Sequence, residues 1–327
     1  MKHHLLAAGL ATIALPAQAQ TPVLTVLTYD SFTSEWGPGP AIEKAFEADC
    51  ACDLRFVPAG DGAALLARIR LEGTASEADV GLGLDTSLTA AAAATGLFAP
   101  HGRPPVAALP VAFDDPLFLP FDWGWFAFVY DTTRLATPPS SFADLAASDL
   151  RIVIQDPRSS TPGLGLLLWV KAAYGDRAGE IWTALADNIV TVTPGWSEAY
   201  GLFLEGEADM VLSYTTSPAY HLIAEADDTK AAALFGEGHY LQIEVAGKLA
   251  ASDQPELADR FLAFMTTGAF QSVIPTTNWM YPVSPVAEGL PEGFDRFRPG
   301  KSLLLSPDEA EGVRDGALAE WQEALAR

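Results

Sequence analysis

Histidine is scarce in this chain of 327 residues, and cysteine is scarcer still. Beyond residue 20 the histidines are His101, His221 and His239, and they are far apart in the sequence. A structural zinc site usually needs four nitrogen or sulfur ligands brought close together. The composition therefore predicts no metal site.

The two cysteines, Cys50 and Cys52, are separated by a single residue. An oxidising compartment would permit a disulfide between them. A bridge across one residue is strained in extended backbone, because successive side chains of a strand alternate between its two faces. The pattern leaves the redox state of this pair open.

Basic residues are few: 19 lysines and arginines face 42 aspartates and glutamates, and the formal net charge is -23. Such a charge repels the phosphates of nucleic acids, which excludes them as a partner class. The negative excess has two interpretations that the sequence leaves open. It either keeps the protein in solution or draws a cationic small ligand towards it.

Long apolar runs are missing after the first twenty residues, where no segment reaches the roughly 18 apolar residues of a membrane-spanning helix. At the start of the chain, Lys2 precedes an apolar stretch from Leu5 to Pro16, and Ala17-Gln18-Ala19 follows. This order is typical of a secretory signal peptide over residues 1–19, and the apolar stretch is too short for an anchor. We therefore expect export to the periplasm.

Catalytic signatures are lacking as well. The sequence contains no G-x-S-x-G, H-E-x-x-H or G-x-x-x-x-G-K-[ST] motif. Gly81-Leu82-Gly83 lacks the third glycine of a dinucleotide-binding loop. The sequence therefore predicts no catalytic residue and no cofactor.

Extended and helical segments alternate along the rest of the chain, apart from a proline-rich stretch between Pro100 and Pro120. This order predicts an α/β protein with a mostly parallel, doubly wound sheet. The last helix begins after Ser306, which forms a capping box with Glu309. We expect strands at 23–29, 53–57, 78–84, 152–155, 189–193 and 208–214, and helices at 38–46, 63–71, up to 96, 163–174, 180–185, 198–204 and from 307.

Two further strands, Trp125–Tyr130 and Tyr240–Val245, are expected to cross between two lobes. Two α/β lobes joined in this way form a hinged clamp that holds its ligand in the cleft between them. The approximate division assigns residues 20–120 and 236–290 to the first lobe and residues 121–235 and 291–327 to the second.

Two strand-to-helix junctions carry the polar residues best suited to a ligand. In the segment 155–163, Ser160 or Thr161 stands at the N-cap position. A helix start offers free N–H groups and partial positive charge, which suit a phosphate. The other interpretation is that these hydroxyls only cap their own helix. Asp61-Gly62 occupies a similar junction, where Asp61 either caps a helix or faces a cationic ligand.

Six aromatic residues lie in or beside predicted loops and strand ends, where open α/β sheets bind their ligands. A cation over an indole or phenol ring gains about 0.5–2 kcal/mol, so the set favours a flat, aromatic or cationic ligand. Three other tryptophans, Trp169, Trp182 and Trp321, fall within helices and are expected to pack in the core. The six are Tyr29, Trp36, Trp196, Tyr214, Tyr220 and Trp279.

Eight sequence blocks follow one another over nearly the whole chain: Thr28–Phe32, Trp36–Pro40, Phe46–Cys50, Pro120–Asp131, Gln155–Trp169, Thr193–Tyr200, Ser213–His221 and Pro275–Pro282. These blocks resemble the thiamine-binding periplasmic proteins of bacterial ABC transporters. The resemblance implies a two-lobed periplasmic binding protein fold of type II. It also implies thiamine, thiamine monophosphate and thiamine diphosphate as ligands.

The resemblance further implies a set of ligand-binding residues. Ser160 and Thr161 would hold the phosphate or hydroxyethyl end, and the aromatic residues would cover the two rings. Residues 214–217 would supply polar partners for the aminopyrimidine, and Asp61 would balance the thiazolium or accept a hydroxyl hydrogen bond. The set consists of Asp61, Gly62, Ser160, Thr161, Trp196, Tyr214, Thr215, Thr216, Ser217 and Pro218, together with Tyr29, Tyr220 and Trp279.

The family's role implies a membrane permease and its ATPase as partners, and we expect a monomer. Two rival functions remain. Thiaminases share the fold and use a cleft cysteine as nucleophile, but the carboxylates around Cys50 and Cys52 would raise a thiol pKa. The other rival is a binding protein for iron or a polyamine. Iron sites of this fold need clustered tyrosines, and Tyr214 and Tyr220 leave that possibility open.

Overall fold

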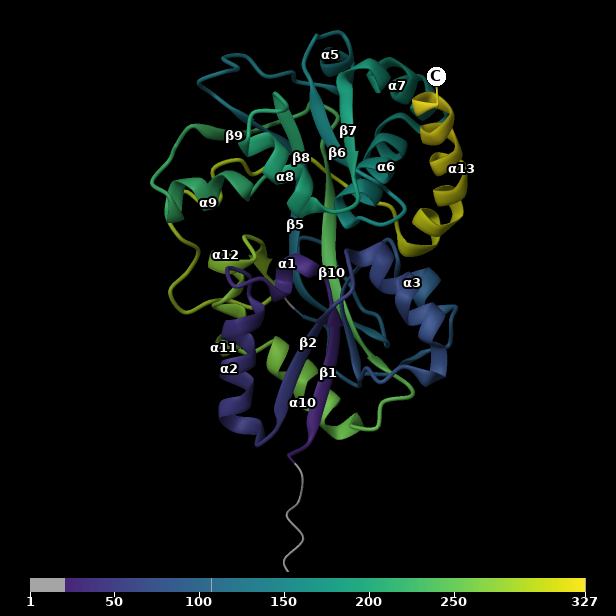
Figure 1. Cartoon of the computed structure of the whole chain (residues 1–327), viewed down its shortest axis with the longest axis vertical. Coiled ribbons are helices and arrows are strands. Elements are labelled where there is room, and N and C mark those ends of the chain that lie inside the picture. The colour runs from purple at the N-terminus through teal and green to yellow at the C-terminus, as the bar shows by residue number, and fades with distance from the viewer. Residues whose placement is uncertain (1–20, 107, 327) are drawn as a thin grey trace, which may run out of the picture.

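The computed structural model describes residues 21–106 and 108–326. The predicted signal peptide, residues 1–19, lies outside the described residues. Two lobes, each a sheet with helices packed against it, follow one another along the long axis of the molecule (Figure 1). Among the described helices, none is long and apolar enough to cross a membrane.

The first lobe is built on three parallel strands in the order β2–β1–β3. Parallel neighbours need a crossover connection, which the helices between them supply. Leu24 and Val26 are buried on one face of this sheet, and Leu27 and Leu84 on the other. The elements are β1 (Val23–Thr28), α1 (Asp30–Thr33), α2 (Gly39–Cys50), β2 (Asp53–Pro58), α3 (Gly62–Glu72), η1 (Gly73–Ala75), β3 (Val80–Asp85), α4 (Thr89–Ala93), β4 (Phe98–Ala99), α10 (Pro255–Met265), α11 (Gly268–Gln271), α12 (Ile274–Thr277) and β11 (Tyr281–Pro282).

The second lobe has three parallel strands in the order β8–β6–β7. Its central helix α6 is buried from Thr161 to Val170, including Trp169, and Trp182 of α7 and Trp321 of α13 are buried in the core as predicted. The elements are α5 (Phe142–Ala146), β6 (Ile152–Gln155), α6 (Thr161–Tyr174), η2 (Gly175–Arg177), α7 (Ala178–Leu185), η3 (Ala186–Asn188), β7 (Ile189–Thr193), α8 (Trp196–Leu204), β8 (Met210–Tyr214), α9 (Ser217–Ala224), β9 (Lys230–Ala233), β12 (Ser302–Leu303) and α13 (Pro307–Leu325).

Two long strands, β5 (Phe118–Asp131) and β10 (His239–Leu249), run through both lobes (Figure 1). The first half of β5 pairs with β10, and its second half pairs with β8 and β9. The crossing strands were predicted, but β5 begins at Phe118 rather than at Trp125. Pro120 is tolerated inside it because the register shifts at a bulge beside its partner Val245.

Both crossing strands are antiparallel to their main neighbours, so the sheet is mixed rather than mostly parallel. The parallel arrangement predicted from the sequence holds only for the outer strands of each lobe. The predicted residue boundaries of the lobes stay a prediction, since β5 belongs to both sheets.

The predicted capping box at the last helix is present. The Ser306 hydroxyl accepts a hydrogen bond from the Glu309 N–H, and the Glu309 side chain accepts one from the Ser306 N–H. Helix α13 then packs against α6 and α7, which places the end of the described chain on the second lobe.

The two cysteines form a disulfide at the end of α2. Ala51 between them adopts the left-handed conformation with φ 53°, which turns the backbone sharply. The Cα atoms of Cys50 and Cys52 are 5.2 Å apart, within the range that a disulfide requires. The objection raised from extended backbone does not apply, because the pair lies at a helix end and not within a strand.

Candidate functional site

A cavity of about 520 Å³ lies between the two lobes. This volume is typical of a small-molecule site. All six aromatic residues singled out in the sequence line it: Tyr29, Trp36, Trp196, Tyr214, Tyr220 and Trp279. They come from both lobes, so the chain has to close its cleft to bring them together.

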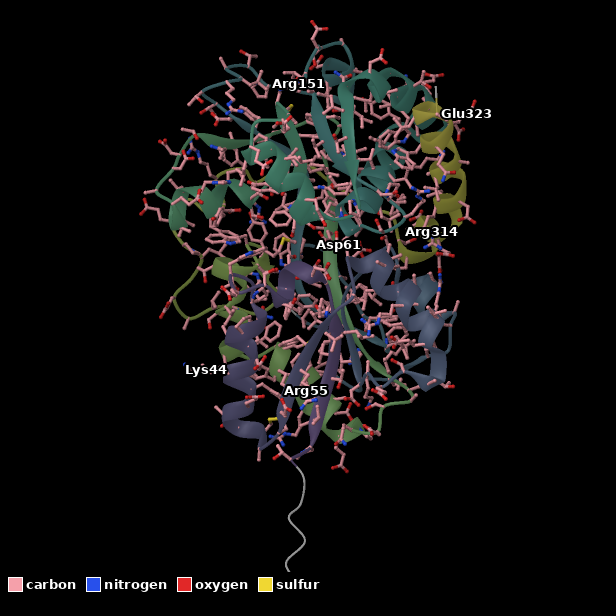
Figure 2. The ribbon with its side chains drawn as sticks, viewed as in Figure 1. Lys44, Arg55, Asp61, Arg151, Arg314 and Glu323 are labelled. Atoms are coloured by element: carbon pink, nitrogen blue, oxygen red, sulfur yellow. A yellow bond between two sulfur atoms is a disulfide. The ribbon has the colours of Figure 1, made fainter. Side chains whose placement is uncertain are left out.

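Two residues at helix starts hold the lobes against each other. Asp61 precedes α3 and Ser160 precedes α6, and neither side chain caps its own helix. Instead, the Ser160 hydroxyl donates to the Asp61 carboxylate across the cleft at 2.7 Å. The Trp196 N–H donates to the same carboxylate oxygen at 3.3 Å. Figure 2 shows Asp61 at the level where the two lobes meet. The interpretation of Ser160 as a helix cap is therefore wrong.

Gly62 and Thr161 form a second contact across the cleft. The Gly62 N–H donates to the Thr161 hydroxyl oxygen at 3.0 Å. A Cβ atom on residue 62 would lie 2.6 Å from that oxygen, so only glycine permits this approach. Close by, the Ala64 N–H donates to the Ser159 carbonyl at 3.1 Å. The lobes thus meet through polar groups from two helix starts, and the structure is a closed one.

Burial at this contact raises the pKa of Asp61 to about 6, although the Ser160 and Trp196 hydrogen bonds act in the opposite direction. In an open cleft the same carboxyl would be solvated, with an ordinary value near 4. A raised pKa means that the closed state favours the protonated acid. Closure without ligand is therefore favoured at low pH, and this advantage is lost as the pH rises through about 6.

Asp61→Asn is expected to remove this pH dependence. From pH 5 to pH 8, the closing equilibrium of the ligand-free native protein should weaken roughly tenfold, while that of the variant should stay constant. Small-angle X-ray scattering at the two pH values measures the change as a rise in radius of gyration. The same rise in both proteins would assign the effect to other groups.

Trp196, Tyr200, Tyr220 and Trp279 form an aromatic wall of the cavity. The Trp196 ring stacks on Tyr200 at 5.0 Å between centroids, with an interplanar angle of 24°. Its indole N–H donates to the Ser213 hydroxyl at 2.8 Å, which fixes the ring orientation. From the other lobe, Trp279 meets the edge of Tyr220 at 5.4 Å. These contacts leave ring faces available to a flat ligand.

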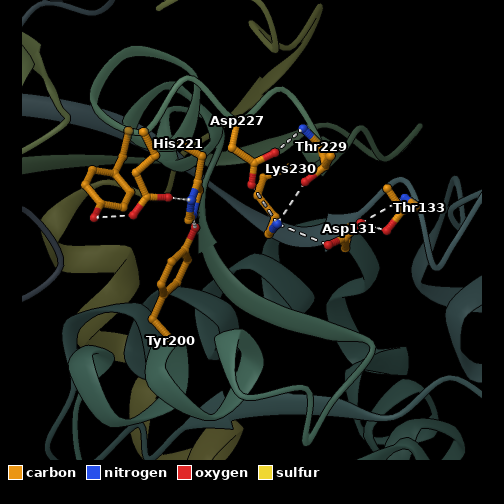
Figure 3. Close-up of polar contacts among 9 residues, drawn as sticks. Asp131, Thr133, Tyr200, His221, Asp227, Thr229 and Lys230 are labelled. Carbon is orange, nitrogen blue, oxygen red and sulfur yellow. Dashed lines mark hydrogen bonds and ion pairs between the residues drawn. The ribbon is translucent and has the colours of Figure 1, made fainter.

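Behind the aromatic wall, a chain of hydrogen bonds through His221 and Glu225 links Tyr200 to Tyr220 (Figure 3). The Tyr200 hydroxyl and His221 Nε2 are hydrogen-bonded at 2.9 Å, and His221 Nδ1 meets Glu225 at 2.7 Å. Glu225 also accepts a hydrogen bond from the Tyr220 hydroxyl at 2.8 Å. The network therefore positions two rings that line the cavity.

His221, Glu225 and Asp227 are close enough to hold a metal ion, since their ligand atoms lie within 4.8 Å of one another. Both nitrogens of His221 are already engaged, however, and Asp227 makes an ion pair with Lys230 at 3.1 Å. A metal would have to break these contacts. We assign the cluster to support of the aromatic wall.

The segment after β8 forms the turn that leads into α9. Ser217 bonds the Ser213 hydroxyl at 2.7 Å and accepts from the Tyr214 N–H at 3.2 Å. Thr215 and Thr216 are buried, and their hydroxyls have no partner among the described residues. Pro218 lies in the first turn of α9 and is buried. The turn therefore supports Tyr214 rather than presenting every predicted residue to the cavity.

The structure thus divides the thirteen predicted ligand-binding residues into two groups. The first lines the cavity, and the second lies directly behind it. Contact with a ligand stays a prediction for both. The first group is Tyr29, Asp61, Thr161, Trp196, Tyr214, Ser217, Tyr220 and Trp279, and the second is Gly62, Ser160, Thr215, Thr216 and Pro218.

The polar lining residues missed from the sequence include Ser31, Tyr200, Glu244 and Asn278. Glu244 had a signal, because it is an acidic residue inside a largely apolar crossing strand. A buried carboxylate needs a partner and often marks a site. Ser31, Tyr200 and Asn278 had no such signal, since polar residues in helices and loops are usually exposed.

Known proteins share this architecture. A family model for bacterial extracellular solute-binding proteins matches residues 37–271. The thiamine-binding periplasmic protein of Salmonella typhimurium is 56% identical over 318 residues, which are 96% of each chain. The protein of the same name from Escherichia coli is 56% identical over 310 residues, 94% of each chain.

A solved structure of a periplasmic thiamin binding protein agrees with the fold. It superposes with a TM-score of 0.91 at 54% sequence identity, covering 96% of this chain and 100% of the other. The chain therefore belongs to the bacterial extracellular solute-binding protein family, among the thiamine-binding periplasmic proteins.

Proposed function

We propose that the protein captures thiamine in the periplasm and delivers it to the permease of an ABC importer. The observation that carries this proposal is the cavity between the lobes, with seven aromatic side chains around it. The relatives at 56% identity are thiamine-binding periplasmic proteins by name. A closed cleft whose two halves meet around the ligand suits capture and later release.

The charge of the cavity fits a cationic ligand. Asp61 and Glu244 line it. No lysine, arginine or histidine of residues 21–106 and 108–326 makes an ion pair with either carboxyl. The thiazolium ring of thiamine carries a fixed positive charge and is flat. It would lie between aromatic faces and satisfy the negative field at the same time.

A thiaminase activity lacks its nucleophile here. Cys50 and Cys52 are joined in a disulfide at the far end of α2, and neither lines the cavity. A disulfide sulfur is not a thiolate and cannot start nucleophilic attack on a ligand. We therefore propose a binding protein without catalytic residues or cofactor, which acts as a monomer beside its permease and ATPase.

The test is to purify the protein from its native host and release its ligand for mass spectrometry. Thiamine or a thiamine phosphate is the expected mass, and titration calorimetry with thiamine should then show one site per chain. Release of iron or of a polyamine, with no heat from thiamine, would replace the proposal by one of its rivals.

Phosphate esters extend the proposed ligand set. Thr161 lines the cavity at the start of α6, where free N–H groups favour an anion. The double variant Ser160→Ala/Thr161→Ala should lose more affinity for thiamine monophosphate than for thiamine. A hydrogen bond to a charged group contributes roughly 1.5–3 kcal/mol, and the unphosphorylated ligand lacks that group.

Calorimetry with both ligands at constant salt measures the difference. Equal losses would show that the two hydroxyls act only in the contact between the lobes. Some phosphate affinity should remain in the variant in either case, because its backbone N–H groups are unchanged.

A further inference from the structure

Two carboxyl groups face each other at the crossing strands, beside the cavity. Asp122 on β5 and Glu244 on β10 are directly opposed in the strand register. Asp122 is completely buried, Glu244 is 5% exposed, and Glu244 lines the cavity. Neither carboxyl was part of the predicted site. Burying two acids side by side is costly, so the arrangement requires an explanation.

Hydrogen-bond donors surround the pair. The Tyr29 hydroxyl donates to Glu244 at 3.0 Å, and the Gln242 amide donates to its other oxygen at 2.7 Å. The Asn278 amide donates to Asp122 at 2.6 Å. Within the described ranges no basic side chain makes an ion pair with either acid. The protein thus supplies neutral donors but no counter-ion.

The pair favours keeping one proton. Two ionised carboxylates in opposed register repel each other, and neither acid has a counter-ion among the described residues that would offset this repulsion. Burial raises the pKa of Asp122 to about 7. Burial, and then the charge of Asp122, raise the pKa of Glu244 as well. Together the two acids hold one negative charge and one proton that can be donated.

The other described groups near Asp122 and Glu244 do not supply a positive charge that would remove the proton from the pair. Asp85 on β3 is also opposed to Glu244 in register, and its carboxylate accepts hydrogen bonds from Ser87. The Tyr214 ring lies near Glu244. Burial raises the pKa of the Tyr214 hydroxyl, and the negative charge of Glu244 raises it further. The groups that face the pair are therefore acids and neutral donors: Asp85 from β3, Tyr29 after β1, Gln242 from β10, Tyr214 from β8 and Asn278 after α12.

A group with one donor and one acceptor side by side matches a particular ligand edge. On an aminopyrimidine, an exocyclic amino group donates and the adjacent ring nitrogen accepts. We propose that the Asp122–Glu244 pair recognises such an amino-substituted nitrogen heterocycle through Glu244, which lines the cavity. One oxygen of Glu244 accepts from the amino group, and the other, which carries the proton of the pair, donates to the ring nitrogen. The inference rests on the proposed function and assigns the aminopyrimidine end of thiamine to the crossing strands.

The test compares two ligands by titration calorimetry: thiamine, and the analogue that carries hydrogen in place of the amino group. The native protein should bind thiamine roughly 10- to 100-fold more tightly, because the analogue leaves the Glu244 oxygen without a donor. Glu244→Met should lose this preference. Glu244→Gln should keep most of it, since a side-chain amide also presents one donor and one acceptor.

Asp85→Asn is the matched control, because it removes a buried carboxyl next to Glu244 that does not line the cavity. It should leave the preference between the two ligands intact. Thermal unfolding of each variant identifies any that fails to fold. The comparison in the native protein needs no variant and remains decisive if Glu244→Met does not fold.

Several results would overturn the inference while thiamine binding stands. They are equal affinity of the native protein for both ligands, an undiminished preference in Glu244→Met, and a preference lost as fully in Glu244→Gln as in Glu244→Met. The last result would show that the protein binds the ligand through an ionised carboxylate and not through a pair of acids that holds a proton. A native protein that binds no thiamine would overturn the proposed function itself.

Discussion

Replacing Trp196 by alanine is expected to weaken thiamine binding by about 1–3 kcal/mol, or roughly 5- to 150-fold. The ring lines the cavity and stacks on Tyr200, so its loss removes an aromatic face and the rigid packing behind it. Its indole N–H donor disappears as well, but the Ser213 hydroxyl keeps its contact with Ser217. Stability should therefore change much less than affinity.

Titration calorimetry with thiamine measures the loss, and thermal unfolding verifies the fold. Trp36→Ala serves as a graded control, because Trp36 also lines the cavity but is 54% exposed. Its loss of affinity should be clearly smaller. If Trp196→Ala bound thiamine as tightly as the native protein, Trp196 would be only a structural neighbour of the ligand.

Trp169→Ala should have the largest effect on stability, lowering the free energy of unfolding by about 3–5 kcal/mol. The Trp169 ring is completely buried in α6 and packs against Phe142 at 4.8 Å and Phe235 at 5.5 Å. Its indole N–H donates to the Gly238 carbonyl at 2.8 Å, and this carbonyl would lose its partner.

Urea unfolding followed by circular dichroism measures this change. Trp169→Phe is the matched control: it keeps much of the buried ring area but removes the hydrogen bond, so about 1–2 kcal/mol should be lost. A loss below roughly 1 kcal/mol in Trp169→Ala would mean that the core around α6 collapses into the space.

The sequence was sufficient for the parts of the fold that depend on local patterns. The outer strands of both lobes and helices α3 and α6 lie within a few residues of the predicted ranges. The capping box at Ser306 was also found, because its two residues are adjacent in one turn. Apolar periodicity and cap chemistry act over a few residues, and a single sequence displays them fully.

Features that depend on distant contacts were harder to predict. The start of β5 was missed because Pro120 argues against a strand until its bulged partner is known. The short helices α11 and α12 carry too few residues for a periodic signal.

The candidate site shows the same limit. Aromatic residues in loops could be recognised as a set, and all six line the cavity. The hydroxyl of Ser160 was expected either to bind a ligand or to cap its own helix, since nothing in the sequence places Asp61 opposite it. Likewise, the role proposed for Glu244 depends on the pairing of β10 with β5, which places Glu244 opposite Asp122.

The shared strands also constrain the order in which the chain can fold. In the first lobe, β3 is paired with β10, which comes after β1 to β9 in the sequence. The sheet of the first lobe is incomplete until β10 has been added, so this lobe cannot finish folding while the second is still being translocated or synthesised. Pairing over such a long stretch of chain is slow, because the loop must close before any contact stabilises it. The chain therefore depends on its late segment throughout export, and an early stop before His239 would leave β3 and the first half of β5 with open sheet edges that invite aggregation.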